Sequence, residues 1–236
     1  MLKAIVFDFD GVIVDSEPLH FRAVARVAES LGITFDYDYY VEHLIGYDDR
    51  DVGRILLARA DGAGQEAGPE AFEGDEVRVT EMKDRKAEVF EQIVREGVGP
   101  IDGALELIEE ASQQMPIAIG SGATRADIDL ILDTLDLRGR FDPIVTANDV
   151  RRSKPDPETY ARAVTRLAES HPNLNLLPGD CLAIEDTAAG LESARGAGLR
   201  TLGLTTSGPA DRLRGAHRVV DSLAGISLEN LRQWLG

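Results

Sequence analysis

Acidic, hydroxyl and ammonium side chains follow short apolar segments at four places in this 236-residue chain. The four places are Asp8 with Asp10, Ser121 with Gly122, Lys154, and Glu185 with Asp186. Two carboxylates that converge on one point repel each other unless a proton or a cation lies between them, and a hard dication such as Mg²⁺ is the simplest answer. This set suits phosphoryl transfer, in which the phosphoryl charge is neutralised and the nucleophile is held in line.

Each of these groups has a simpler interpretation when it is taken alone. Acidic residues are common in turns because they form local hydrogen bonds. Lys154 follows Arg151 and Arg152, and a run of charges is usually a solvated surface. A parallel sheet, however, aligns the carboxyl ends of its strands, so that residues far apart in sequence meet at one edge. The four places together therefore indicate a single site.

The elements that would position these residues are short apolar strands alternating with amphipathic helices. The nearly continuous apolar run over 2–7 predicts a strand buried on both faces. Further strands are predicted over 116–120, 143–146, 181–184, 200–204 and 218–220, and helices over 104–114, 124–135, 157–170, 187–198 and 227–235. The alternation predicts an α/β protein with a doubly wound, mainly parallel sheet of the Rossmann-like kind.

The segment 16–97 has a different sequence pattern and contains no predicted strand. Helices are expected from about residue 19, over 38–60 with an interruption at Gly46, and over 77–95, while 61–75 is polar and rich in glycine. We therefore expect a core of 1–15 and 98–236 with an inserted helical domain of 16–97. The chain would cross between the two at Asp15-Ser16 and near Gly99-Pro100.

Composition excludes several classes of protein. The net charge of −17 argues against a nucleic-acid partner, although local cations still allow an anionic substrate. No apolar run is long enough for a membrane span, and a leader is not expected because the first strand begins at residue 2. Cys181 is the single cysteine, which excludes an internal disulfide and fits a buried small hydrophobe. We expect a cytoplasmic protein, with a monomer as the default.

Four motifs occur in an order that resembles one known family. They are Asp8-Phe9-Asp10-Gly11-Val12-Ile13, Ile119-Gly120-Ser121-Gly122, Ser153-Lys154-Pro155-Asp156-Pro157 and Ile184-Glu185-Asp186-Thr187-Ala188-Ala189-Gly190. Each motif is weak alone, but the ordered set resembles the haloacid dehalogenase-like superfamily. The resemblance is to the branch with a helical cap after the first strand, which includes phosphoglycolate phosphatases and β-phosphoglucomutases, and it covers essentially the whole chain.

The resemblance implies roles for the two aspartates of the first motif. Asp8 would be the nucleophile and a metal ligand, and would form an aspartyl-phosphate that splits one difficult step into two. Asp10 would be the general acid and base, and its backbone carbonyl would bind Mg²⁺. An acid at this position favours phosphate chemistry over dehalogenation, because an alkoxide leaving group needs a proton and a halide does not.

The same resemblance implies roles for the other three motifs. Ser121 would hold the transferring phosphoryl group, with a backbone N–H offered by Gly122. Lys154 would neutralise the nucleophile and a phosphoryl oxygen. Asp186, with Glu185 beside it, would complete the Mg²⁺ site.

In this branch the cap recognises the substrate, and four of its residues are expected to face the active site. They are His20, Gly46, Arg50 and Lys86, although a histidine at a helix start is as often a residue without such a role. The mutase pattern has a lysine directly before the glycine, where this chain has Ile45, and the spacing from that glycine to the arginine is one residue longer. Without that cation the second phosphate of a sugar bisphosphate is held more weakly.

The expected function is a Mg²⁺-dependent phosphatase that acts on a small phosphorylated metabolite through an aspartyl-phosphate. A β-phosphoglucomutase-like enzyme, which returns the phosphoryl group to its substrate, is the first alternative. The second is a non-enzymatic signalling module of the receiver kind, phosphorylated on Asp8. Receivers also place aspartates and a lysine at sheet ends, but they need neither a helical insertion nor the acid at position 10.

Overall fold

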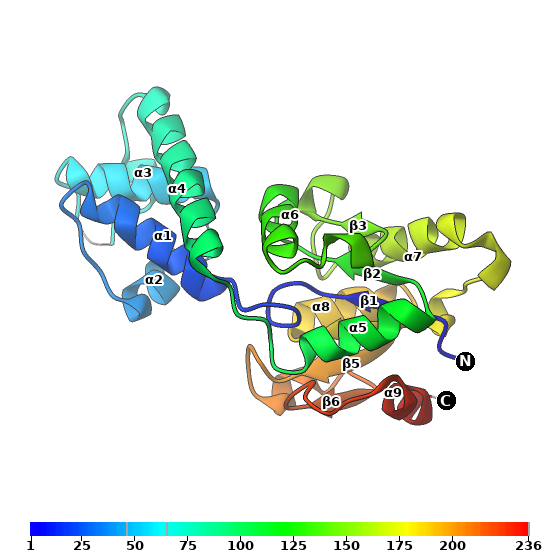
Figure 1. Cartoon of the computed structure of the whole chain (residues 1–236). Coiled ribbons are helices and arrows are strands. Elements are labelled where there is room, and N and C mark those ends of the chain that lie inside the picture. Colours follow the sequence, from blue (N-terminus) through cyan, green and yellow to red (C-terminus); the bar gives the residue numbers. More distant parts are fainter. Residues whose placement is uncertain (46, 65, 236) are drawn as a thin grey trace. The chain divides into compact units, whose positions relative to one another are not determined.

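The computed structural model describes residues 1–45, 47–64 and 66–235, and this part of the chain forms two compact units (Figure 1). One unit comprises Met1–Asp15 and Val98–Gly236, and the other is Ser16–Gly97. The two segments that connect the units are joined by a short antiparallel bridge between Val14 and Pro100. They therefore leave the first unit side by side.

Within the described residues, the first unit contains a six-stranded parallel sheet in the order β3-β2-β1-β4-β5-β6. Its strands are β1 (Ala4–Phe7), β2 (Ile117–Gly120), β3 (Ile144–Val145), β4 (Cys181–Glu185), β5 (Arg200–Leu204) and β6 (Arg218–Val220). Every residue of β1 is buried, as expected for a central strand that is covered on both faces. The predicted α/β fold with a doubly wound parallel sheet is confirmed.

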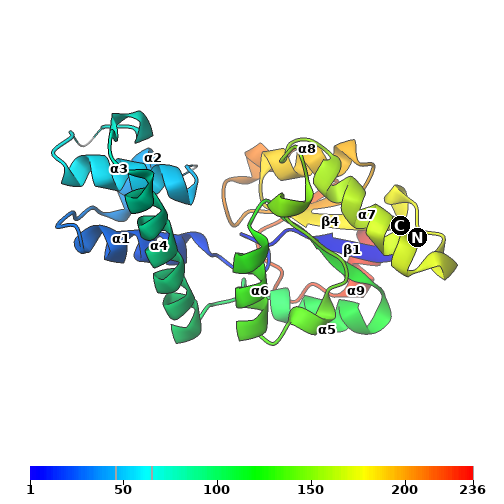
Figure 2. The same cartoon turned by 90° about the horizontal axis from the view of Figure 1, so that it is seen from above.

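Helices cover both faces of this sheet. They are α5 (Ala104–Gln114), α6 (Arg125–Thr134), α7 (Glu158–Ser170), α8 (Ala188–Gly196) and α9 (Leu228–Leu235), with short 3₁₀ turns η2 (Arg138–Arg140), η3 (Ala147–Asp149), η4 (Pro172–Leu174), η5 (Pro178–Asp180) and η6 (Ala210–Leu213). Figure 2 shows α7 and α8 on one side of β1 and β4, and α5 and α9 on the other. Val6 of β1 and Tyr160 of α7 belong to the core under α7 and α8.

The winding of the sheet reverses at β1, which lies between β2 and β4. Phe7 lies opposite Ile119 of β2 and Ile184 of β4, so the three strands end at the same level. In open α/β sheets, the crevice at such a reversal is where ligands bind. The register therefore brings the residues that follow β1, β2 and β4 to one edge.

The second unit is helical, and no strand occurs in its described residues. Its helices are α1 (Glu17–Glu29), α2 (Tyr37–His43), α3 (Asp49–Ala60) and α4 (Glu76–Glu96), with the 3₁₀ turn η1 (Pro69–Ala71). The segment expected as an interrupted helix over 38–60 is two helices, because Asp48 caps α3 by accepting bonds from the N–H groups of Arg50 and Asp51. Gly46, the expected point of interruption, lies outside the described residues.

Two expectations from composition can be compared with the structure. In the described ranges, no helix has the length and apolar character that crossing a membrane requires. Cys181 is a buried free thiol, and burial raises its pKa to about 12. It therefore packs as a small hydrophobic side chain, as expected from its place at the start of a strand.

Candidate active site

Asp8 directly follows β1 at the edge where the three central strands end. Its N–H donates to the carbonyl of Ile184 at 2.9 Å, which fixes the tip of β1 against β4. Its side chain is buried, and burial together with the charge of Glu185 raises the pKa of Asp8 well above its usual value. A carboxylate in such a place stays ionised only where a cation compensates it.

Lys154 supplies one cation. Its Nζ lies 2.8 Å from Oδ1 of Asp8 and 2.5 Å from Oε1 of Glu185, and its side chain is only 11% exposed. Burial by itself would lower the pKa of Lys154, but the two carboxylates outweigh it and raise the pKa, so the ammonium is charged at neutral pH. Lys154 is therefore part of the site, whereas Arg151 and Arg152 beside it are exposed.

Glu185 ends β4 and is fully buried, yet donors surround both of its carboxylate oxygens. Oε1 accepts from Lys154 and from the hydroxyl of Tyr160, which lies 2.7 Å away. Oε2 accepts from the N–H of Asp186 at 3.1 Å and from the N–H and hydroxyl of Thr187 at 3.3 and 3.1 Å. Glu185 thus holds Lys154 and the start of the loop that carries Asp186.

Asp186 is also buried, but its two oxygens differ. Oδ2 accepts a hydrogen bond from the hydroxyl of Ser207. Oδ1 is buried and has no hydrogen-bond partner among the described residues. Burial raises the pKa of Asp186 to about 6, even though the bond from Ser207 acts in the opposite direction.

The described residues bring these carboxylates into one cluster. One oxygen each from Asp8, Glu185 and Asp186 lies within 4.8 Å of the others. Three buried carboxylates beside a single ammonium leave a negative charge that a divalent cation would balance. The ligand atoms that these residues offer are all oxygens, which is what a hard dication prefers. One of them, Oδ1 of Asp186, is buried without a hydrogen-bond partner among the described residues and could therefore face the cation.

Asp10 and Gly11 lie in the turn that follows Asp8. Asp10 is half-buried, and the turn is closed by the N–H of Gly11, which donates to the carbonyl of Val14 at 2.7 Å. Gly11 has φ of +73°, and a Cβ there would lie 1.9 Å from Oδ2 of Asp186. Glycine is therefore required both by the backbone conformation and by the carboxylate that packs against it.

Ser121 and Gly122 follow β2 at the same edge of the sheet. The N–H of Ser121 donates to the carbonyl of Val145 at 2.9 Å, which aligns it with β3. Its hydroxyl is buried and accepts from the N–H of Ala123 at 3.0 Å, whereas Gly122 is exposed. The strand register thus places a hydroxyl and an accessible backbone amide on the edge that carries Asp8.

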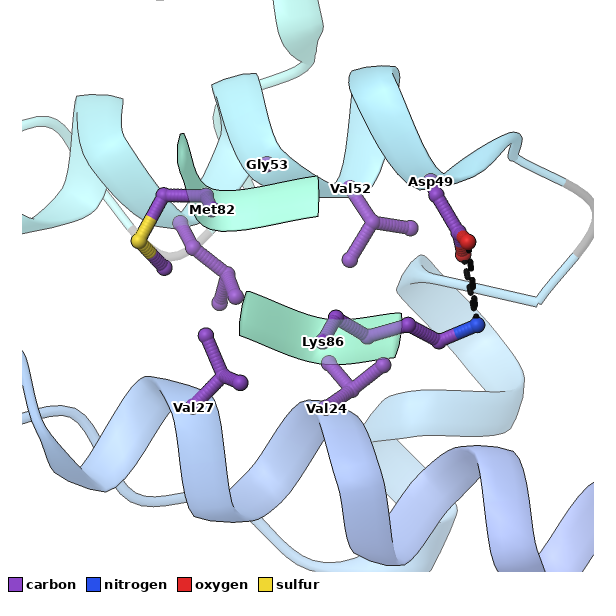
Figure 3. Close-up of a pocket in the computed structure, with 8 residues that line it drawn as sticks. Val24, Val27, Asp49, Val52, Gly53, Met82 and Lys86 are labelled. Carbon is purple, nitrogen blue, oxygen red and sulfur yellow. Dashed lines mark hydrogen bonds and ion pairs between the residues drawn. The ribbon is translucent and has the colours of Figure 1, made fainter. Parts of the chain in front are cut away.

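Two of the cap residues expected to recognise the substrate lie together in the helical unit. Lys86 of α4 is buried, and its Nζ lies 2.8 Å from Asp49 of α3 and 3.1 Å from Nδ1 of His20. Figure 3 shows Lys86 and Asp49 at one end of a small pocket whose other walls are mainly apolar. The ring of His20 stacks on the ring of Phe90, with 4.3 Å between the ring centroids. A substrate contact of His20 and Lys86 stays a prediction.

Arg50, the third such residue, belongs to a different cluster of the cap. Its guanidinium lies 2.7 Å from the carboxylate of Glu76, which also pairs with Arg54. The side chains of Arg50 and Glu76 are exposed, so the pair is held weakly. Its expected substrate contact also stays a prediction, and the expected contact of Gly46 falls outside the described residues.

Sequence analysis assigned no role to Tyr160, Thr187 or Ser207. Tyr160 lies on the buried face of α7, and Thr187 caps α8 by accepting from the N–H of Gly190. Ser207 follows β5, the strand next to β4. The run of hydroxyl residues that follows a fifth parallel strand is the one indication that could have found Ser207.

A Gly190→Ala variant tests how tightly Glu185 is held. A Cβ at this helical position would lie 1.9–2.0 Å from the carboxylate of Glu185, so that carboxylate must move. We expect a loss of about 1–3 kcal/mol in the free energy of unfolding, together with reduced activity. Gly139→Ala, where no atom lies within 4 Å, is the control and is expected to be neutral or slightly stabilising. Equal stability of the two variants in urea denaturation would contradict the packing described here.

Comparison with known proteins identifies the family. The profile of the haloacid dehalogenase-like hydrolases matches residues 2–198. A curated relative, the phosphorylated carbohydrates phosphatase of Thermotoga maritima, is 31% identical over 201 residues, which cover 85% of this chain and 84% of that protein. The chain belongs to the haloacid dehalogenase-like hydrolases, and it is an enzyme of that family.

Other relatives have names that imply different reactions. The β-phosphoglucomutase of Bacillus subtilis is 29% identical over 241 residues, with 98% of this chain and 95% of that protein covered. The solved structure of CbbY from Rhodobacter sphaeroides in complex with phosphate has a TM-score of 0.74 and 26% identity, and covers 98% of this chain and 100% of that one. Both phosphatases and mutases thus occur among the relatives.

Proposed function

We propose that this enzyme is a Mg²⁺-dependent phosphatase that hydrolyses a small phosphorylated metabolite, such as a sugar phosphate, through an aspartyl-phosphate on Asp8. The observation that supports it best is the ammonium of Lys154, 2.8 Å from a buried Asp8, beside a buried Asp186 oxygen that lacks a partner among the described residues. This combination keeps a nucleophilic carboxylate ionised and leaves a place for a cation next to it.

In the first chemical step, an oxygen of Asp8 attacks phosphorus and the bond from phosphorus to the ester oxygen breaks. Asp10 gives its proton to the leaving alkoxide. Lys154 neutralises a phosphoryl oxygen, while the hydroxyl of Ser121 and the N–H of Gly122 donate to the others. The products are the alcohol and a phosphorylated Asp8.

In the second step, Asp10 is ionised and takes a proton from water as that water attacks phosphorus. The bond from phosphorus to Asp8 breaks, and inorganic phosphate leaves. Mg²⁺, held by Asp8, the carbonyl of Asp10 and Asp186 with Glu185 beside it, would supply further neutralisation of the phosphoryl charge. The chain returns to its starting protonation state, as a catalyst must.

A phosphosugar mutase is the second candidate, because the Bacillus subtilis relative is named β-phosphoglucomutase. Hydrolysis is favoured by Ile45, which stands where the mutase pattern has a lysine. The cap cations Arg50 and Lys86 each lie against an acidic residue of their own unit. A second phosphate would have to compete with these carboxylates for both cations.

A phosphate-release assay separates the two candidates. Sugar phosphates and small phosphorylated acids are offered with Mg²⁺, with and without a sugar bisphosphate. The proposal predicts inorganic phosphate from at least one monophosphate, independent of the bisphosphate. Interconversion of sugar phosphate isomers that requires the bisphosphate and releases no phosphate would establish the mutase instead.

Metal binding is expected to depend on pH. Because the pKa of Asp186 is raised to about 6, a proton occupies its carboxyl group below that pH and competes with Mg²⁺. The affinity for Mg²⁺ is therefore expected to fall as the pH decreases through 6, by up to about tenfold per pH unit for each competing proton. Calorimetric titrations of Mg²⁺ above and below that pH measure the effect. An affinity that does not change across this range would contradict the role of Asp186 as a ligand.

A further inference from the structure

The loop that follows β5 contacts two of the segments that carry acidic residues. The hydroxyl of Ser207 donates to Oδ2 of Asp186, and the hydroxyl of Thr206 donates to the carbonyl of Gly11 at 2.5 Å. Neither side chain takes part in the two chemical steps described above. The two bonds connect the loop after β5 to Asp186 and to the turn that follows Asp8, which are the segments that would surround the cation.

The bond from Ser207 makes the two oxygens of Asp186 unequal. Oδ2 has a hydroxyl donor, whereas Oδ1 is buried and has no hydrogen-bond partner in the described ranges of the chain. A carboxylate with one oxygen held in this way cannot rotate without losing the bond. The oxygen that remains for a cation is therefore Oδ1.

Packing restricts the same carboxylate from the other side. A Cβ at position 11 would lie 1.9 Å from Oδ2 of Asp186 and 2.9 Å from the hydroxyl of Ser207, so the backbone of Gly11 lies close to both groups. The hydroxyl of Thr206 holds this stretch of backbone by donating to the carbonyl of Gly11. The turn after Asp8 and the carboxylate of Asp186 are thus fixed relative to each other by one loop.

We propose that Ser207 is a positioning residue, which orients Asp186 so that Oδ1 is available to the divalent cation shared with Asp8. This inference rests on the metal site of the proposed function. Groups that hydrogen-bond to metal ligands in this manner typically change metal affinity by about 10–100-fold when they are removed.

The loop contains its own control. The hydroxyl of Thr205, two residues before Ser207, donates to Asp221 at 3.0 Å, and Asp221 is not one of the three carboxylates of the acidic cluster. Thr205→Ala therefore removes the same kind of bond, from a hydroxyl to a carboxylate, in the same loop. Ser207→Thr keeps the hydroxyl at the position under test.

The test is calorimetric titration of Mg²⁺ into the wild type, Ser207→Ala, Ser207→Thr and Thr205→Ala, with thermal unfolding of each metal-free protein as the check on folding. We expect the Kd of Ser207→Ala to rise about tenfold or more, and the other two variants to stay within about threefold of wild type. In phosphate-release assays, Ser207→Ala should need correspondingly more Mg²⁺ and should regain most of its kcat at saturation.

The possible failures are distinguishable. If the wild type binds Mg²⁺ and Ser207→Ala binds it equally well, the positioning role is overturned while the proposed function stands. The role is also overturned if Ser207→Thr, which retains the hydroxyl, or Thr205→Ala, which leaves the site intact, weakens binding as much as Ser207→Ala. If the wild type binds no divalent cation, the metal-dependent function and the positioning role are both overturned.

Discussion

An Asp8→Asn variant is expected to lose about 10⁴-fold or more of its phosphatase activity in the presence of Mg²⁺. The amide cannot attack phosphorus, so the aspartyl-phosphate does not form. The substitution preserves the shape of a side chain that is 9% exposed. Phosphate release from a generic phosphate ester measures the loss. Full activity in this variant would rule out the covalent route.

The same variant is expected to remain folded. Burial and the charge of Glu185 raise the pKa of Asp8, so the ionised carboxylate destabilises the metal-free protein at neutral pH and a neutral amide removes that cost. Lys154 keeps its partner Glu185 at 2.5 Å. The thermal midpoint of the metal-free variant should therefore equal or exceed that of the wild type. Asp211→Asn, at an exposed position of η6, is the matched control and should leave activity unchanged.

A Lys154→Ala variant is expected to have the second-largest effect. Preorganised charge at a phosphoryl group contributes several kcal/mol to transition-state stabilisation, so kcat/KM should fall by about 10³-fold. Arg152→Ala is the control on the same loop, because Arg152 is exposed and pairs only with Asp156, four residues along, among the described ion pairs. Its effect on kcat/KM should stay within about twofold. An equally small effect of Lys154→Ala would remove Lys154 from the site.

Lys154→Ala should also destabilise the protein. It leaves the buried carboxylates of Asp8 and Glu185 without their shared cation, and breaking a buried pair in this way costs about 3–5 kcal/mol. Adding Glu185→Gln should restore part of the free energy of unfolding but none of the activity. Urea denaturation of the metal-free variants measures the first result, and phosphate release measures the second. Restored activity in the double variant would show that Lys154 acts only through stability.

Sequence was sufficient for the parts of the site that belong to strand ends. The apolar run before Asp8 and the one before Glu185 each predicted a buried strand, and parallel pairing in register then brings their ends together. The strand pattern alone did not place Lys154, because it lies in a loop and the direction of its side chain depends on the fold. Lys154 was assigned to the site because its motif, Ser153-Lys154-Pro155-Asp156-Pro157, occurs in order with the other three.

Hydrogen-bond partners that depend on three-dimensional packing could not be predicted. Ser207 lies in a Thr-Thr-Ser-Gly stretch that is typical of an ordinary turn, and its bond to Asp186 arises only because β5 pairs with β4. Tyr160 is a buried aromatic residue of α7. That its hydroxyl donates to Glu185 depends on how α7 packs on the sheet.

The cap was harder to predict than the core because its helices carry many charges. Helical periodicity located α1 and α4, and the interruption expected within 38–60 falls between the end of α2 at His43 and the start of α3 at Asp49. The pairing of Lys86 with Asp49 joins α4 to α3, and no local pattern indicates it. Substrate recognition therefore remains the part of the function for which sequence gives least guidance.

The stereochemistry of phosphoryl transfer tests most directly whether Asp8 is the nucleophile. A phosphorothioate substrate, made chiral at phosphorus by sulfur and two oxygen isotopes, is hydrolysed in water labelled with the third isotope, and the configuration of the thiophosphate product is determined. Two successive in-line displacements, first by Asp8 and then on Asp8, each invert the configuration at phosphorus, so net retention is predicted. Net inversion would show that water attacks the substrate directly, and would contradict the aspartyl-phosphate on which this account of the enzyme depends.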